Sequence, residues 1–363
     1  MRALFAAMTD VILVLDTSES MTFGEDKNNA AAHGGVDMRD PINCNGTDPT
    51  ADPLLGTDGY PGDCHPFQEV KEAAVGFVNQ LYFPYDRVGV ITFDRWSDSA
   101  GRLDLTNNKS TIIDYIKNRK VTPWMQTCPW ITADKATNGP CADYSKGYYE
   151  LSCTTFLNTS PNNDPTPCGT TNIGSGMEIA NKMVTLPGLM RQNSLWVIIL
   201  LTDGAANASV NLDDPLDPGP ADVEYFGYCP ASTWVQQPFC RDPFSDPYSA
   251  IGVHRHAFNS AGYDSADYAY DAIDKVADRK NNAASKLIYS IGLGNLVTSN
   301  TACIDPATGL PYSPARCDPE AGQKLLEYAA DKGDGVYYFA PTTNQLQRVF
   351  QAIAENIAFR LTH

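Results

Sequence analysis

Apolar and polar positions alternate along the chain in blocks that predict strands and helices in turn. Apolar runs predict strands at 10–17, 86–94, 194–204 and 286–294, and the run at 194–204 is nearly continuous, as is typical of a strand in a sheet covered on both faces. Shorter runs at 101–106 and 335–340 predict two further strands. Segments with apolar residues at helical spacing predict amphipathic helices, at 66–82, 109–119, 171–186, 265–283 and 319–331, with a terminal helix after Thr342.

The regular alternation of strands and helices predicts the fold class. It favours an α/β fold with a doubly wound, mostly parallel central sheet and helices on both faces. We expect a single domain over residues 1–363. Loops longer than about 12–15 residues are uncommon in compact domains. Here we expect four long insertions without a periodic pattern, at about 21–65, 120–170, 206–264 and 296–318.

All ten cysteines fall within these insertions. An even number of cysteines confined to loops is typical of disulfide stapling in an oxidising compartment. Zinc binding is the alternative, but no Cys-x-x-Cys pair is present to favour it. Ten cysteines allow many pairings; bridges between sequence neighbours would join Cys44–Cys64, Cys128–Cys141, Cys153–Cys168, Cys229–Cys240 and Cys303–Cys317.

The charge and the hydropathy pattern exclude some partners. A formal net charge of −17 repels nucleic acid and anionic membranes. No apolar run reaches the roughly 18–20 residues that cross a bilayer, so we expect no membrane insertion by this chain. The first ten residues lack the length and cleavage site of a secretory signal, which suggests a mature or trimmed form.

Oxygen-bearing side chains follow two of the predicted buried strands. Asp16, Ser18 and Ser20 come directly after the first strand, and Asp203 ends the strand at 194–204. Thr171 stands at the start of a predicted helix. Ligands of open α/β sheets bind beyond the carboxyl ends of the strands, so we expect these five residues to converge there. Their oxygens form a hard ligand set that suits Mg²⁺, Mn²⁺ or Ca²⁺.

With these motifs the chain resembles the von Willebrand factor type A (VWA) domains that carry a metal-ion-dependent adhesion site (MIDAS). The resemblance rests on "DTSES" after the first strand, "TTNIGSG" and "LLTDG", in the family's order. "RVGVITFD" resembles the family's second strand, and "GDGVYYFAPTTNQLQRVFQAIAENI" resembles the ending of bacterial members. Glu19 departs from the glycine that is common in the middle of the first motif. Together the matches span about 10–357 without the insertions.

The resemblance implies a function. Ser18, Ser20 and Thr171 would touch the metal through hydroxyls, and Asp16 and Asp203 directly or through water. One exposed metal position would accept an Asp or Glu carboxylate from a partner protein. We therefore expect a secreted or cell-surface adhesion module of a bacterial envelope, similar to tight-adherence pilus proteins.

Other functions and sites stay open beside this one. The chain could instead be a structural or tip subunit of a surface filament that self-assembles, with the metal only stabilising it. We expect no enzyme activity, because a dehalogenase-like phosphotransferase would need a carboxylate where Ser18 stands. His254 and His256 could bind a metal but lack an evident third ligand. A separate calcium site could use an aspartate-rich loop, with Asp48, Asp52, Asp58 and Asp63.

Overall fold

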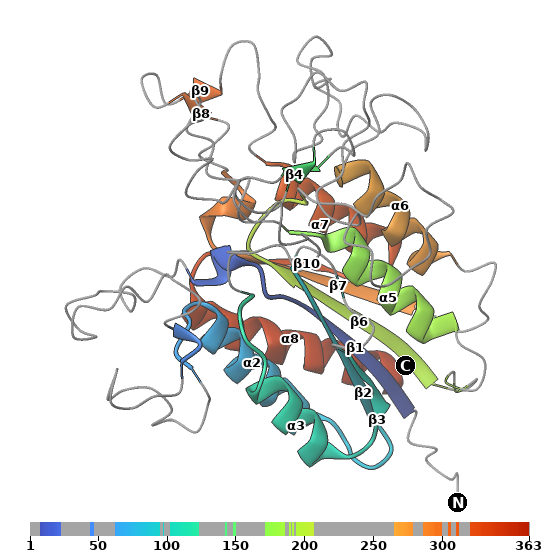
Figure 1. Cartoon of the computed structure of the whole chain (residues 1–363). Coiled ribbons are helices and arrows are strands. Elements are labelled where there is room, and N and C mark those ends of the chain that lie inside the picture. Colours follow the sequence, from blue (N-terminus) through green and yellow to red (C-terminus); the bar gives the residue numbers. More distant parts are fainter. Residues whose placement is uncertain are drawn as a thin grey trace, which may run out of the picture.

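The computed structural model describes the main sheet, the helices around it and short parts of the insertions. It covers residues 8–22, 44–46, 62–94, 97, 102–122, 142–143, 148–149, 171–185, 189, 191, 194–206, 265–278, 286–299, 304–305, 310–311 and 320–362. Figure 1 shows the strands side by side, with helices flanking them. The α/β fold that the sequence predicts is therefore confirmed.

The main sheet has six strands in the order β10-β7-β6-β1-β2-β3. Neighbouring strands are parallel except β2 and β3, which are antiparallel, so the prediction of a mostly parallel sheet is also confirmed. The chain moves from β1 outward to β2 on one side and later from β6 outward to β7 on the other. The strand bounds are Met8–Asp16 (β1), Arg87–Phe93 (β2), Leu103–Thr106 (β3), Ser194–Thr202 (β6), Lys286–Leu293 (β7) and Tyr337–Ala340 (β10).

Helices occupy the segments that the periodicity predicts. They are α2 (Phe67–Gln80), α3 (Lys109–Lys117), α5 (Ile173–Thr185), α6 (Ser265–Ala277), α7 (Ala321–Lys332) and α8 (Thr343–Thr362), with short 3₁₀ turns η1 (Glu19–Thr22) and η5 (Asn295–Val297). The pattern predicted that α6 continues to 283, but the helix ends at Ala277. Lys286 Nζ donates to the Val276 carbonyl at 2.7 Å and so satisfies part of this helix end. Among the helices that the structure describes, none has the length and apolar character needed to cross a membrane.

Two apolar clusters explain the continuous hydrophobic runs. In β1, Val11, Leu13 and Leu15 belong to one cluster, which also includes buried residues of α2 and α8. Ile12 and Val14 belong to the other, with buried residues of α5, α6 and α7. Successive side chains of a strand point to opposite faces, so a strand covered on both faces has apolar residues throughout.

Parts of the insertions have structure that the sequence did not predict. Two pairs of two-residue strands lie there: Ala142–Asp143 (β4) with Tyr148–Tyr149 (β5), and Ile304–Asp305 (β8) with Leu310–Pro311 (β9). Two residues are too few to show a period, so pattern reading cannot find them. The Cys44–Cys64 disulfide is present as predicted. The other eight cysteines lie outside the described residues.

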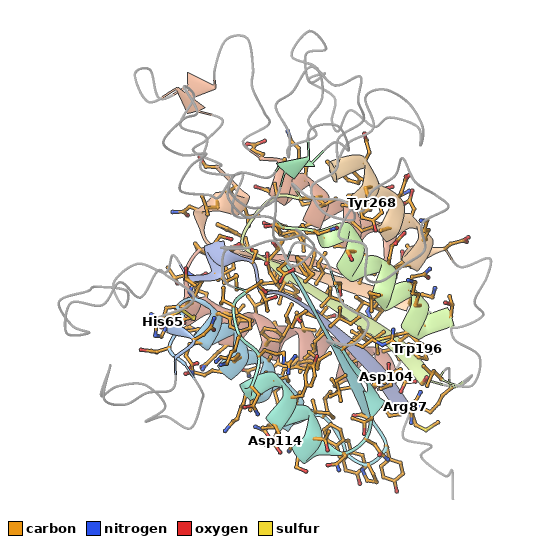
Figure 2. All side chains as sticks on the ribbon, viewed as in Figure 1. His65, Arg87, Asp104, Asp114, Trp196 and Tyr268 are labelled. Atoms are coloured by element: carbon orange, nitrogen blue, oxygen red, sulfur yellow. A yellow bond between two sulfur atoms is a disulfide. The ribbon has the colours of Figure 1, made fainter. Side chains whose placement is uncertain are left out.

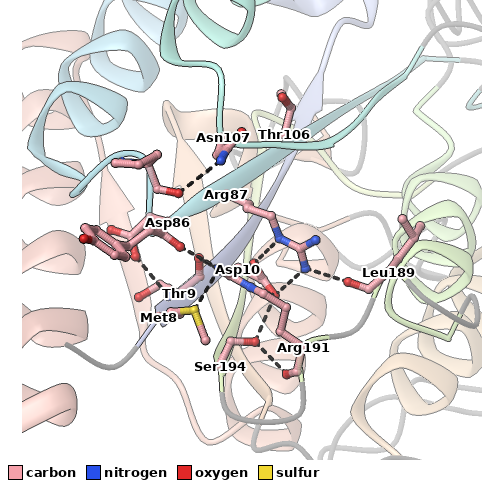
Figure 3. Close-up of polar contacts among 12 residues, drawn as sticks. Met8, Thr9, Asp10, Asp86, Arg87, Thr106, Asn107, Leu189, Arg191 and Ser194 are labelled. Atoms are coloured by element: carbon pink, nitrogen blue, oxygen red, sulfur yellow. Dashed lines mark hydrogen bonds and ion pairs between the residues drawn. The ribbon is translucent and has the colours of Figure 1, made fainter. Parts of the chain in front are cut away.

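An ion cluster around a buried carboxylate closes the amino edge of the sheet, where β1 and β2 begin (Figure 3). Asp10 on β1 is fully buried. Arg87 donates Nε to its Oδ1 and Nη2 to its Oδ2, both at 2.8 Å, in the bidentate geometry that arginine and carboxylate favour. Arg191 and the Ser194 hydroxyl donate to the same carboxylate, the latter at 2.9 Å.

These partners set the ionisation of Asp10. Burial alone raises a carboxyl pKa, but the hydrogen bonds from Arg87, Arg191 and Ser194 outweigh it, so the pKa of Asp10 is lowered. The two guanidinium groups also hold backbone carbonyls, including Leu189 O at 2.6 Å from Arg87 Nη2. The cluster therefore ties three chain segments together as a structural unit.

Candidate metal centre

The loop after β1 brings three predicted residues together. The Ser18 backbone N–H donates to Asp16 Oδ1 at 2.7 Å, so the carboxylate shapes the first turn of the loop. The chain then enters η1, and the hydroxyls of Ser18 and Ser20 meet with their Oγ atoms 3.1 Å apart. Asp16 and Ser18 are buried, and Ser20 is partly exposed. One acidic and two hydroxyl side chains thus share one small space.

β6 contributes the second carboxylate. β1 and β6 are parallel neighbours, with Leu15 opposite Leu201, so both strands end at the same edge. Ser20 Oγ donates to Asp203 Oδ1 at 2.7 Å, and Thr202 Oγ1 donates to Asp16 Oδ2 at 2.6 Å. Four of the five predicted residues therefore form one continuous hydrogen-bonded chain. The two strands also flank the point where the strand order reverses, which is the usual ligand position in open α/β sheets.

Thr171, the fifth residue, reaches this edge from a third direction. It is 5% exposed and precedes α5. The next residue, Asn172, donates its backbone N–H to the Asp94 carbonyl at 2.6 Å. Asn172 Oδ1 also accepts from Ser175 N at 2.9 Å, as an N-cap does at the start of a helix. Because Asp94 follows β2, and β2 pairs with β1, these bonds hold the Thr171 backbone at the carboxyl edge.

The two carboxylates have perturbed pKa values. Burial raises the pKa of Asp16, hydrogen bonds from Ser18 and Thr202 lower it in part, and the charge of Asp94 raises it again, to about 6. Burial and the charge of Asp16 raise the pKa of Asp203 well above its usual range, against a hydrogen bond from Ser20. Over the described ranges, no basic side chain forms an ion pair with Asp16 or Asp203. Asp16 and Asp203 are buried and have hydroxyl and backbone groups as their hydrogen-bond donors, so their charged forms are disfavoured.

Sequence reasoning missed two residues of this centre. Asp94 adds a third negative charge close enough to act on Asp16. Its signal was its position, because it ends β2 as Asp16 ends β1, and Asp16 lies opposite Phe93 in the ladder. Thr202 is fully buried and hydrogen-bonds Asp16. Its signal was weaker, since a threonine at the end of a β-strand is common in any sheet.

The chemistry of these donors fits a hard divalent cation. Carboxylate and hydroxyl oxygens are the ligands that Mg²⁺, Mn²⁺ and Ca²⁺ prefer. No group of three or more His, Cys, Asp or Glu residues suited to a metal occurs in the described part of the chain. The predicted set differs from such a group, because it consists of two carboxylates and three hydroxyls. Burial raises both pKa values, and a cation placed between Asp16 and Asp203 would compensate the negative charges that burial disfavours.

The other metal sites considered from the sequence lie mostly outside the described residues. Asp63, the one described member of the aspartate-rich loop, forms an ion pair with His65 at 2.5 Å. A second carboxylate, Glu69 Oε2, lies 2.8 Å from the other ring nitrogen of His65. Asp48, Asp52, Asp58, His254 and His256 lie outside the described residues. Figure 2 shows His65 and Arg87 at opposite ends of the strands, so this histidine is at the carboxyl edge.

Comparisons with known proteins give only distant structural likenesses. No protein-family model matches the chain, and no curated protein matches it. The structure is similar to that of the conserved hypothetical protein BatB from Bacteroides thetaiotaomicron, at 12% identity and a TM-score of 0.41, over 96% of this chain and 98% of that one.

Two further likenesses are to longer chains. The PilB minor pilin from Streptococcus sanguinis is 16% identical, with a TM-score of 0.48, over 98% of this chain and 63% of that one. Proximal thread matrix protein 1 from the mussel byssus, described with a zinc-occupied MIDAS motif, is 12% identical, with a TM-score of 0.41, over 97% and 48%. This chain thus spans less than two thirds of each. At these identities and TM-scores, the likenesses carry no argument about function.

Proposed function

We propose that this protein binds a partner protein through a divalent cation held at the carboxyl edge of its sheet. The observation that carries the proposal is the buried pair Asp16 and Asp203. The two carboxylates are joined through hydroxyls, burial raises the pKa of both, and neither has a cationic side chain among its hydrogen-bonding partners in the described part of the chain. Buried charges are normally paired or coordinate a metal, and a divalent cation would supply the counter-charge for this pair.

In this proposal Asp16, Ser18, Ser20, Thr171 and Asp203 hold Mg²⁺, with Mn²⁺ or Ca²⁺ as alternatives. When bound, the cation supplies a positive centre that attracts a carboxylate of the partner. Three of the five ligands are neutral hydroxyls, so the site neutralises the ion less than an all-carboxylate set would. The domain binds in this way and does not catalyse a reaction.

The same proposal covers the wider setting of the protein. We infer a doubly wound VWA-type domain over 1–363, secreted or on a cell surface, with a role in adhesion like that of pilus-associated proteins. The strand order and the two apolar clusters support the winding. The Cys44–Cys64 disulfide supports an oxidising compartment, because such bonds rarely persist in the cytosol.

Cation binding can be tested before any partner is known. We expect Mg²⁺ or Mn²⁺ at 100 times its Kd to stabilise the protein by about 2.7 kcal/mol, because a ligand of the folded state shifts the unfolding equilibrium. Calorimetric titration with each metal alone measures the affinity, and EDTA should reverse the shift. The variants Asp16→Ala and Asp203→Ala should show neither effect.

Partner binding is the second stage of the test. An immobilised peptide with a single glutamate should be retained in Mg²⁺ and released by EDTA, and its glutamine counterpart should not be retained. Retention that is unchanged in EDTA would contradict the proposal. Regular polymers in electron micrographs, formed equally by Asp16→Ala, would instead favour a structural subunit in which the metal only stabilises the fold.

A further inference from the structure

A disulfide-closed corner of the chain lies next to the proposed metal loop. Cys44 and Cys64 are bonded, and both are buried in the same apolar cluster as Met21 of η1. The Asp63 N–H donates to the Cys44 carbonyl at 2.7 Å, which closes the corner a second time. Gly62 has φ +78°, and a Cβ there would lie 2.7 Å from Cys44 O, so the two chain segments of the corner are in close contact.

Asn45 extends from this corner and holds a third segment. Its Nδ2 donates to the Val121 carbonyl at 2.6 Å, and its Oδ1 accepts from the Val121 N–H at 3.1 Å. One amide side chain thus satisfies both backbone groups of Val121, as a neighbouring strand would. Val121 is fully buried, so its backbone groups have little water as an alternative partner.

The segment that Asn45 holds is hydrogen-bonded to the metal loop. Thr122 N–H donates to the Thr17 carbonyl at 2.8 Å. On its other side, Thr17 donates both its N–H and its hydroxyl to the Phe93 carbonyl, at 2.8 and 3.0 Å. Thr17 stands between Asp16 and Ser18 in the chain. Its backbone is therefore fixed from β2 on one side and from residues 121–122 on the other.

From these contacts we infer that Asn45 and the Cys44–Cys64 disulfide position the metal loop for cation binding. The inference rests on the proposed function. Asn45 is a positioning residue, because it acts on the loop through Val121 and Thr122 and does not touch the proposed ligands. Ligand oxygens must be held in place to bind a cation tightly, and loss of the groups that orient them typically weakens metal affinity.

The experiment compares two asparagine variants of the full oxidised chain. Asn45→Ala removes both bonds to Val121. Asn108→Ala is the matched control, because Asn108 caps α3 by accepting from Thr111 N at 3.3 Å and lies beyond β3, toward the amino edge. We expect Asn45→Ala to bind Mn²⁺ about tenfold more weakly than wild type, and Asn108→Ala to bind it normally, although both lower Tm in EDTA.

A second variant tests the disulfide itself. Cys44→Ser combined with Cys64→Ser should weaken Mn²⁺ binding in the same direction, and Asn45→Ala remains decisive if this double variant does not fold. Equal Mn²⁺ affinity in wild type and Asn45→Ala, with only Tm lowered, would overturn the inference and leave the proposed function intact. A wild-type chain that binds no Mn²⁺ would overturn the proposed function, and the inference with it.

Discussion

Two aspartates on one strand show how differently a protein can treat the same buried group. Asp10 and Asp16 are at opposite ends of β1, and both are fully buried. Arg87 and Arg191 hold Asp10 and lower its pKa, whereas hydroxyls hold Asp16 and its pKa is raised to about 6. Burial is common to both, so it does not distinguish a structural carboxylate from a functional one. The difference lies in whether the fold supplies the counter-charge.

The largest expected effect on stability is at the Asp10 end of β1, where arginines supply the counter-charge. Asp10→Ala should destabilise the protein by about 3–5 kcal/mol, because it leaves two partly buried guanidinium groups without their carboxylate. Urea unfolding measures this loss. Asp104→Ala is the control, since its ion pair with Arg102 is exposed and should contribute little. If Asp10→Ala lowered the free energy of unfolding as little as the control does, the contrast between Asp10 and Asp16 would not hold.

The second effect is at the end without a counter-charge. Asp16→Asn should weaken Mg²⁺ binding by at least about 100-fold, because loss of a ligand exceeds the effect of losing its outer partners. In EDTA the same variant should be as stable as wild type or more stable, because a buried unpaired carboxylate is removed. Calorimetry in Mg²⁺ and urea unfolding in EDTA measure the two parts. A metal-free variant destabilised as strongly as Asp10→Ala would show that Asp16 is structural.

His65 offers an intermediate case, a counter-charge that pH can remove. Burial alone lowers the pKa of His65, but Asp63 and Glu69 outweigh it and raise the pKa from 6.5 to about 9. The imidazolium is favoured in the folded state, so its stabilisation is complete below pH 6.5 and is lost as pH rises through about 9. The free energy of unfolding of wild type should exceed that of His65→Gln by about 1–2 kcal/mol at pH 6 and by much less at pH 10.

Unfolding of both proteins in urea across this pH range, with disulfides kept oxidised, measures the His65 effect. A difference that does not change between pH 6 and pH 10 would show that the histidine acts through packing and not through its charge.

The smallest expected effect concerns Asp94. Asp94→Asn should weaken Mg²⁺ binding by about threefold to tenfold, since it removes a nearby negative charge while the proposed ligands remain. Titration at low and high salt measures the change in Mg²⁺ affinity, and the loss should be smaller at high salt because Asp94 is only partly buried and salt screens its charge. An effect as large as that of Asp16→Asn would make Asp94 a ligand.

The sequence predicts the carboxyl edge far better than the amino edge. Asp16, Ser18 and Ser20 form a short local motif, and Asp203 follows an unmistakable buried strand. In the sequence Asp10 is only a polar residue at the start of a strand, although Arg87, Arg191 and Ser194 all donate hydrogen bonds to it. Its partner Arg191 comes from a stretch without a periodic pattern, and no spacing links it to Arg87. Local motifs can be recognised in one dimension, but pairings between remote single residues depend on the folded topology.

The same limit applies to the corner around Asn45. The cysteine count predicts that a disulfide closes it, and pairing of neighbours gives Cys44–Cys64. Nothing in the sequence connects Asn45 with Val121, because the contact depends on where α3 ends after packing beside α2. Helical periodicity gives the face of a helix, but the path of the chain after its last turn is set by tertiary contacts.

The placement of the long insertions has a consequence for how this scaffold can be altered. Each insertion follows the end of a strand or of α3 and precedes the start of a helix, and these junctions lie at the carboxyl edge of the sheet. In contrast, β1 begins and α8 ends at the opposite edge (Figure 1). Each doubling of a loop adds only about 0.6 kcal/mol of closure entropy. Segments of other lengths could thus be grafted beside Asp16 and Asp203. A tether joined at Met8 or Thr362 would leave the carboxyl edge of the sheet facing outward.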